Sequence, residues 1–326
     1  MRLFFVGDFS GNNGPASVNK SLKNEMPNDT LYSAEKNKFI RVLELVFKIS
    51  KTDAVLFSGL SKINIIGFKI AKLLRKKSAY LMHGSQHIEG EINQNYNVKS
   101  VDVEYRVLEC APIIICVSEI FMNRIKEHYP EFKDKITYVN NGIDWNLINI
   151  SEKVQLERQP NLLLSVGGGA PRKGIVMICE AIKDLNENKN LDLKLIVIGA
   201  NGKDTNKIKS YPFVTYIEKV SQQDMVSFYK MAQLYIQNSV FETFGLAPIE
   251  ALMCGGNILI SQNVGVNSLL KLEGNELIYN VENIEEISKK ILFNMSNSNN
   301  NKIINSLNKE STSVKASYQE ILQILK

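Results

Sequence analysis

The sequence predicts two doubly wound α/β domains, each with a parallel sheet between layers of helices. The chain has 326 residues, which suits two domains of roughly 150 residues each. Short runs of β-branched and aromatic residues alternate with longer helical patterns from end to end. Runs such as Leu195 to Ile198 are apolar at every position, which is typical of strands buried on both faces of a Rossmann-like sheet.

The predicted strands fall into two groups on either side of a polar segment. Segment 149–160 is charged and ends in a proline before a new strand, so we expect the domain boundary there, with one domain at 1–150 and the next at 151–310. The Asn- and Ser-rich residues 296–301 predict a surface loop, and a last helix near 312–325 (residues 311–326) is expected to return to the first domain. Strands are predicted at 3–9, 54–58, 79–83, 113–118, 137–140, 162–167, 193–199, 214–217, 234–237, 257–261 and 276–279.

Composition indicates a globular protein of a reducing compartment. Hydrophobic residues make up 44% and charged residues 22% of the chain, which excludes disordered and fibrous classes. The first residues lead into a strand-like run without the features of a signal peptide, and no apolar run approaches the roughly 18 residues of a spanning helix. We therefore expect a cytoplasmic protein. Its scattered cysteines do not support a metal site: Cys110, Cys116, Cys179 and Cys254.

A local excess of positive charge lies between Lys62 and Lys77. Residues 54–88 contain six basic residues and no acidic residue, although the net charge of the chain is only +5. On a helical wheel the isoleucines and leucines of this segment share one face and its lysines an adjoining one. We expect the apolar face to pack on the sheet and the lysines to meet an anionic membrane surface at the inner face of the cell membrane; the alternative is an ordinary solvated helix. No motif beside this segment indicates nucleic-acid binding. The predicted apolar face consists of Ile63, Ile66, Ile70, Leu73 and Leu74, and the predicted lysine face consists of Lys62, Lys69, Lys72 and Lys76.

Two glutamates eight positions apart form the strongest chemical motif. Glu242 is followed by Thr243-Phe244-Gly245-Leu246, and Pro248 suits the first turn of a helix that would carry Glu250. The glycine would let the backbone approach a ligand, and amides near the helix start would attract phosphate. The alternative is a strand, loop and helix with two ordinary solvated glutamates.

A glycine-rich turn, Gly167 to Gly169, precedes Arg172 and Lys173. A lysine point charge and an arginine fork can together neutralise a diphosphate, although a solvated pair of cations is the alternative. The first domain has its own turn, which ends in Gly14. His83 ends strand 79–83, where ligands of open α/β sheets bind; a single histidine is more often structural, and His87 is a competing candidate.

Together these motifs resemble glycosyltransferase family 4, a group of retaining enzymes with the GT-B fold. The resemblance covers nearly all of residues 160–270 and the first half more thinly. It implies two Rossmann-like domains that face each other across a cleft. One departure is that Gly168-Gly169 stand where many relatives carry an arginine. The resemblance rests on Glu242 to Glu250, Arg172-Lys173-Gly174, Val220-Ser221 and Asn141-Gly142-Ile143-Asp144.

The resemblance also implies roles for individual residues. Glu250 would hold the ribose of the donor nucleotide, Glu242 would bind the donor sugar, and Arg172 and Lys173 would stabilise the leaving diphosphate. His83 would lie near the anomeric carbon. The remaining donor-binding residues would be Gly14, Val220, whose backbone would read the base, and Thr243, Phe244, Gly245 and Leu246. No Asp-x-Asp triplet occurs, so we expect no metal and no cofactor, the nucleotide sugar being a substrate.

The sequence thus predicts a metal-independent hexosyltransferase of capsule or lipopolysaccharide synthesis. The expected donor is a UDP-sugar, with a GDP-sugar less favoured, and the expected acceptor is a growing surface glycan, such as a lipid-linked oligosaccharide. The alternative is a non-catalytic GT-B subunit that partners another glycosyltransferase or binds a protein acceptor. A dinucleotide-dependent oxidoreductase is disfavoured, because neither glycine-rich turn has the G-x-G-x-x-G spacing.

Overall fold

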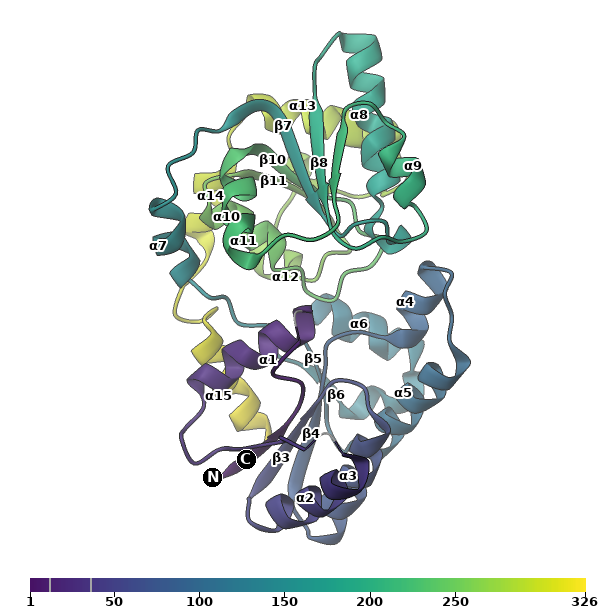
Figure 1. The fold of residues 1–326 in the computed structure, drawn as a ribbon, viewed down its shortest axis with the longest axis vertical. Helices are drawn as coiled ribbons and strands as arrows, with labels where there is room; N and C mark the ends of the chain where they lie inside the picture. Colours follow the sequence, from purple (N-terminus) through teal and green to yellow (C-terminus); the bar gives the residue numbers. More distant parts are fainter. Residues whose placement is uncertain (12, 36) are drawn as a thin grey trace. The chain divides into compact units, whose positions relative to one another are not determined.

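The chain divides into two compact units, shown in Figure 1. The computed structural model describes residues 1–11, 13–35 and 37–326; Asn12, in the first glycine-rich turn, lies outside the described residues. Unit 1 comprises residues 1–144 and 310–326, and unit 2 comprises residues 145–309. Each unit contains a six-stranded sheet whose neighbouring strands are all parallel. The predicted fold class is therefore confirmed.

The sheet of unit 1 has the strand order β2-β1-β3-β4-β5-β6. All five predicted strands are present, and the two-residue β2 was not predicted because so short a strand shows no periodicity. The strands are β1 (Leu3–Val6), β2 (Leu31–Tyr32), β3 (Ala54–Ser58), β4 (Lys77–Met82), β5 (Ile114–Cys116) and β6 (Ile136–Tyr138). The helices are α1 (Gly14–Glu25), α2 (Lys38–Ser50), α3 (Lys62–Leu73), α4 (Gln86–Ile92), α5 (Val98–Cys110), α6 (Glu119–His128), the 3-10 helix η1 (Pro130–Lys135) and α15 (Val314–Ile324).

Helices cover both faces of this sheet. α1 packs against α15, while α2 packs against α3 and α3 against α5. Right-handed crossovers require this division, because the chain leaves β1 toward β2 but then crosses back to β3 and beyond. β1 and β3 both lie inside the sheet, with a strand on each side, and are buried at every position.

The sheet of unit 2 has the order β12-β11-β10-β7-β8-β9. All six predicted strands are present: β7 (Gln159–Val166), β8 (Lys194–Ile198), β9 (Val214–Ile217), β10 (Ala232–Gln237), β11 (Asn257–Ser261) and β12 (Leu277–Ile278). α8 packs against α13. α10 packs against α11, and α11 packs against α14. The helices are α7 (Asn146–Glu152), α8 (Ile175–Lys189), α9 (Thr205–Lys209), α10 (Gln222–Met231), α11 (Ala247–Met253), α12 (Asn267–Leu270), α13 (Ile284–Ser296) and α14 (Asn300–Ser306), with η2 (Pro171–Lys173) and η3 (Gly274–Glu276).

The division between the units lies slightly earlier than residues 150/151. The polar segment forms α7, which contacts α10 and α11 of unit 2, and the buried Ser151 hydroxyl donates to the Met253 carbonyl at 3.2 Å. Helix α15 belongs to unit 1, where Ile143 pairs with Ser313 in a parallel bridge. Residues 296–301 are only partly a loop, because α13 ends at Ser296 and α14 begins at Asn300.

The predicted orientation of α3 is wrong. The face of α3 that is buried consists of Asn64, Gly67, Phe68 and Ala71, whereas Ile66 and Leu73 are exposed. Gly67 lies directly against the Phe57 ring of β3, where a β-carbon would collide with the ring. This close approach, together with a hydrogen bond of 2.6 Å from Asn64 Nδ2 to the Gly59 carbonyl, turns Ile66 and Leu73 away from the sheet.

Candidate functional site

The topology of unit 2 defines where a ligand would bind. The chain leaves β7 toward β8 and β9 on one side and later returns to β10 on the other. Ligands of open α/β sheets bind beyond the carboxyl ends of the strands at such a change of direction. We call the carboxyl ends of β7 and β10 and the loops after them the switch edge of unit 2.

Three predicted residues meet at the switch edge, and we call them the charged cluster: Arg172, Lys173 and Glu242. The Lys173 ammonium forms a short ion pair with the Glu242 carboxylate, and Arg172 Nη1 lies 3.5 Å from Glu242 Oε2. The same oxygen accepts a hydrogen bond of 3.2 Å from Gln237 Nε2 at the end of β10. The three side chains are only 12–21% exposed, so their interactions are weakly screened by solvent.

The electrostatics keep Glu242 ionised. Burial alone would raise its pKa, but the charges of Lys173 and then Arg172 outweigh burial and hold the pKa of Glu242 below its usual value. The charged cluster thus holds two cations and one carboxylate in a largely buried place, with one net positive charge. An incoming anion can take the position of the carboxylate beside the two cations.

Backbone hydrogen bonds fix both loops of the charged cluster. The Val240 amide donates to the Arg172 carbonyl at 2.8 Å, which ties the β7 loop to the β10 loop. The Gly265 amide donates to the Glu242 carbonyl at 3.0 Å, and the Val266 amide donates to the Phe244 carbonyl at 2.7 Å. Glu242 therefore sits in a loop that is held from both sides.

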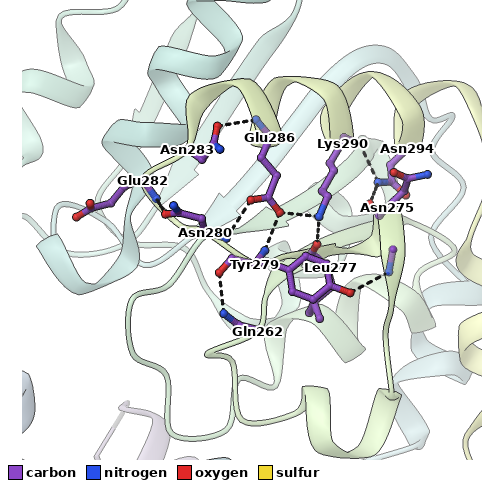
Figure 2. A network of polar contacts seen from close by, with 11 residues as sticks. Gln262, Asn275, Leu277, Tyr279, Asn280, Glu282, Asn283, Glu286, Lys290 and Asn294 are labelled. Atoms are coloured by element: carbon purple, nitrogen blue, oxygen red, sulfur yellow. Dashed lines mark hydrogen bonds and ion pairs between the residues drawn. The ribbon is translucent and has the colours of Figure 1, made fainter.

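A polar network that includes Glu286 and Lys290 of α13 holds the start of the loop that carries Gly265 (Figure 2). The Glu286 carboxylate accepts from the amides of Tyr279 at 2.8 Å and Asn280 at 3.0 Å, and Lys290 donates to it at 2.6 Å. The Tyr279 carbonyl in turn accepts from Gln262 Nε2 at 2.7 Å. Gln262 begins the loop that pairs with Glu242. This network therefore positions the loop behind the charged cluster.

The glycines after β7 explain the departure from the family pattern. Gly168 has φ +62°, and a β-carbon there would collide with the Ala200 carbonyl oxygen after β8. The turn is thus packed against the neighbouring loop and leaves no room for a side chain at residue 168.

Glu250 lies on α11, as predicted, and Pro248 is in the first turn of that helix. Its carboxylate accepts a hydrogen bond of 2.7 Å from the Tyr229 hydroxyl of α10. Burial raises the pKa of Glu250, and the hydrogen bond from Tyr229 opposes that shift. Residues Thr243, Phe244, Gly245 and Leu246 form the loop into α11, whose N-cap Leu246 provides no side-chain cap. Val220 lies beyond the carboxyl end of β9, on the same side of the sheet.

Unit 1 places His83 after β4, beside the change of direction between β1 and β3. Its Nε2 lies 3.0 Å from the Ser58 hydroxyl. The amide nitrogen of Asn19 donates to the Asp8 carbonyl at 3.1 Å, so Asn19 Oδ1 faces Ser58 and accepts its proton at 2.8 Å. Ser58 has one proton to donate, so it must accept from His83 Nε2–H. His83 Nδ1 is then the unprotonated nitrogen.

Burial lowers the pKa of His83 to about 4, so the imidazole is neutral near pH 7. His87 belongs to a different cluster, where its Nδ1 lies 2.9 Å from His128 Nε2 and 3.3 Å from the Tyr129 hydroxyl. Gly14 opens α1, and among the described residues no atom lies within 4 Å of a β-carbon built there. Packing in unit 1 therefore does not require a glycine at this position.

Two absences were also found within the described ranges. No group of three or more His, Cys, Asp or Glu side chains there is arranged to hold a metal ion. No helix in the same part of the chain has the length and apolar character needed to cross a bilayer.

Comparison with solved structures identifies the fold as GT-B. HepE of Anabaena in complex with UDP aligns over 100% of this chain and 99% of its own, with a TM-score of 0.73 and 14% identity. Sucrose-phosphate synthase from Thermosynechococcus elongatus aligns over 99% of this chain and 98% of its own, with a TM-score of 0.69 and 16% identity. At these identities the likeness concerns the fold.

The chain belongs to the family described as glycosyl transferases group 1, whose model matches residues 148–310. An uncharacterized glycosyltransferase of Methanocaldococcus jannaschii is 26% identical over 185 residues, which are 55% of this chain and 48% of the relative. The Escherichia coli UDP-Gal:alpha-D-GlcNAc-diphosphoundecaprenol alpha-1,3-galactosyltransferase is 27% identical over 239 residues, 64% of this chain and 61% of the relative. The chain spans about half the length of the curated relatives it matches.

Several residues of the candidate sites were not predicted. Gln237 could have been found, because a polar residue that ends the apolar strand 234–237 close before Glu242 is a signal of its own. Tyr229, Ser58 and Asn19 carry no such signal, since their partners lie 21, 25 or 39 positions away in the sequence.

Proposed function

We propose that this glycosyltransferase moves a hexose from a UDP-sugar, with retention at the anomeric carbon, to a lipid-linked glycan. The observation that carries the proposal is the convergence of Arg172 and Lys173 on Glu242 at the switch edge of unit 2. The UDP bound to HepE and the activity for which the Escherichia coli galactosyltransferase is named support the choice of donor and acceptor class.

The proposed chemistry follows from the charges. An acceptor hydroxyl attacks the anomeric carbon, the bond from that carbon to the diphosphate oxygen breaks, and the electron pair leaves with the diphosphate. The acceptor proton passes to the departing diphosphate. Arg172 and Lys173 would stabilise the growing negative charge, and their release from Glu242 would free its carboxylate for the hydroxyls of the sugar.

The other predicted roles complete the proposal. Glu250 would accept from the ribose hydroxyls, with Tyr229 favouring its ionised form, and the loop from Thr243 to Leu246 would contact the sugar and phosphates. Val220 would lie at the base. In unit 1, His83 would offer Nδ1 as a hydrogen-bond acceptor to a sugar hydroxyl, and Gly14 would leave space for the donor. Metal independence and a cytoplasmic location are parts of this proposal.

The test is a titration with UDP, UDP-glucose, UDP-N-acetylglucosamine and GDP-mannose, by calorimetry and thermal shift, with and without EDTA. A saturating ligand should stabilise the protein by about 2–3 kcal/mol and raise its melting temperature by a few degrees. We expect a uridine nucleotide to bind in EDTA, and Glu250→Ala to weaken this binding. Binding that is lost in EDTA would contradict metal independence, and nucleotide binding without transfer would favour the non-catalytic subunit.

A further inference from the structure

Helix α2 has apolar residues on two opposite faces. Leu45 and Ile49 are fully buried on its inner side. On the outer side, residues spaced at helical intervals leave their side chains in solvent: Phe39 is 86% exposed, Leu43 70% and Phe47 58%. Ile40 and Val46, beside them, are also exposed. We call these five residues the outer face of α2.

A surface helix of a globular protein normally has polar residues on its outer face, because only the inner face is covered. Isolated exposed apolar residues are common, but a contiguous set on one helix marks a surface that binds another protein or a membrane. Helix α3, which packs against α2, also carries exposed apolar residues: Leu73 is 82% exposed, and Ile66 is exposed as well.

Positive charge lies at the end of α2 and on the neighbouring α3. Lys51 of the α2 C-cap lies 3.9 Å from the centre of the Phe47 ring. Glu44, the acidic residue of α2, is buried and paired with Lys48 at 2.6 Å, so it adds no negative charge to the surface. Helix α3, the turn after it and the first residue of β4 bring six basic residues and no acidic residue: Lys62, Lys69, Lys72, Arg75, Lys76 and Lys77.

We propose that the outer face of α2 inserts into the surface of an anionic lipid bilayer, with the basic residues of α3 bound to the head groups. Apolar side chains on one face of a helix with Lys and Arg beside them are the pattern of helices that lie in a membrane interface. Basic residues at such a surface strengthen binding by roughly fivefold each, a gain that salt screens.

Charge argues against a second copy of the chain as the occupant. Two copies joined through this face would bring two sets of basic residues together, which repel each other. The inference rests on the proposed function for its purpose, because a lipid-linked acceptor lies at a membrane. Its test does not need the donor or the acceptor.

The test is sedimentation of the full chain with vesicles of phosphatidylcholine alone or mixed equally with phosphatidylglycerol, at low and high salt. We expect binding to the anionic vesicles at least about tenfold stronger than to the neutral ones, and weaker at high salt. Leu43→Asp/Phe47→Asp should reduce binding about tenfold or more, and Lys69→Glu/Lys72→Glu by a similar factor. Phe293→Asp, at an exposed residue of α13, and Lys189→Glu/Lys315→Glu are matched controls that should bind as the unchanged protein does.

UDP binding separates this proposal from the proposed function. The variants of α2 and α3 should keep the UDP-dependent shift in melting temperature, which also shows that they are folded. Equal binding of the unchanged protein and the α2 variant would overturn the proposal, as would no binding to either vesicle. A dimer in sedimentation velocity that Leu43→Asp abolishes, without vesicle binding, would assign the face to a second copy instead.

Discussion

The two sheets place their candidate residues at equivalent positions, but those of unit 2 are charged and those of unit 1 are neutral. At the switch edge of unit 2, two cations keep the buried Glu242 ionised. In unit 1, burial keeps His83 neutral, and its partner Ser58, like the Asn19 that Ser58 donates to, is uncharged. If the proposed function holds, this difference would suit unit 2 to a charged diphosphate and unit 1 to hydroxyl groups, which need direction rather than charge.

The largest effect is expected from Lys173, which supplies the point charge of the charged cluster. Lys173→Met keeps most of the side-chain volume but removes the ammonium, so the leaving diphosphate loses electrostatic stabilisation. We expect the rate of UDP release from the donor to fall by about 10²–10³-fold, measured in a coupled assay. Lys183→Met on the exposed surface of α8 is the control and should change the rate less than twofold. A loss below about tenfold for Lys173→Met would break the contrast between the units.

The two units also differ in whether the fold requires the glycine beside the candidate site, Gly168 in unit 2 and Gly14 in unit 1. Gly168 has φ +62° and lies against the Ala200 carbonyl, so Gly168→Ala should destabilise the protein by about 2–3 kcal/mol. Gly14→Ala meets open space and should change stability by less than about 0.5 kcal/mol. Urea unfolding checks both. If Gly14→Ala nevertheless weakens binding of the donor, a ligand rather than the fold requires that glycine.

The pKa of His83 gives a prediction for unit 1. Its value of about 4 lies below the 6.5 of an unperturbed histidine, so the unfolded chain binds a proton first. The stabilisation is present above pH 6.5 and is lost as the pH falls from 6.5 toward 4, by at most about 3 kcal/mol. The pKa of His128 is also lowered, by burial and then by His87, and adds to the same loss.

A ¹³C NMR titration of the three histidines measures this directly, with His83→Gln and His128→Gln to assign the signals. We expect the His83 ring to titrate near pH 4, and its unprotonated nitrogen to be Nδ1. A His83 signal that titrates near 6.5 would show that the ring is solvated. The contrast between a charged site in unit 2 and a neutral histidine in unit 1 would then no longer hold.

The sequence predicted the sheets better than the side-chain partners. Strands such as β3 and β11 match their predicted bounds, because a parallel strand buried on both faces is a nearly continuous apolar run. The face of α3 was wrong, since the wheel identifies an apolar side but not the contact of Gly67 with Phe57 that decides which side is buried. The charged cluster joins residues 69 and 70 positions apart, and the family resemblance, not spacing, placed them together.

The smallest effect is expected at Glu250, where a hydrogen bond rather than a charge adjusts the carboxylate. Tyr229→Phe removes the hydroxyl that donates to Glu250 at 2.7 Å and leaves a buried carboxyl whose pKa rises further. UDP binding should weaken a few-fold at pH 7, and more at pH 6, where a larger share of Glu250 is protonated. Tyr211→Phe is the control, because the Tyr211 hydroxyl donates a hydrogen bond of 2.6 Å to the Glu180 carboxylate. This pair does not belong to the switch edge. Equal UDP affinity of the two variants by calorimetry would mean that Glu250 does not bind the nucleotide as a carboxylate. Of Glu242 and Glu250, only Glu242 would then act through its charge.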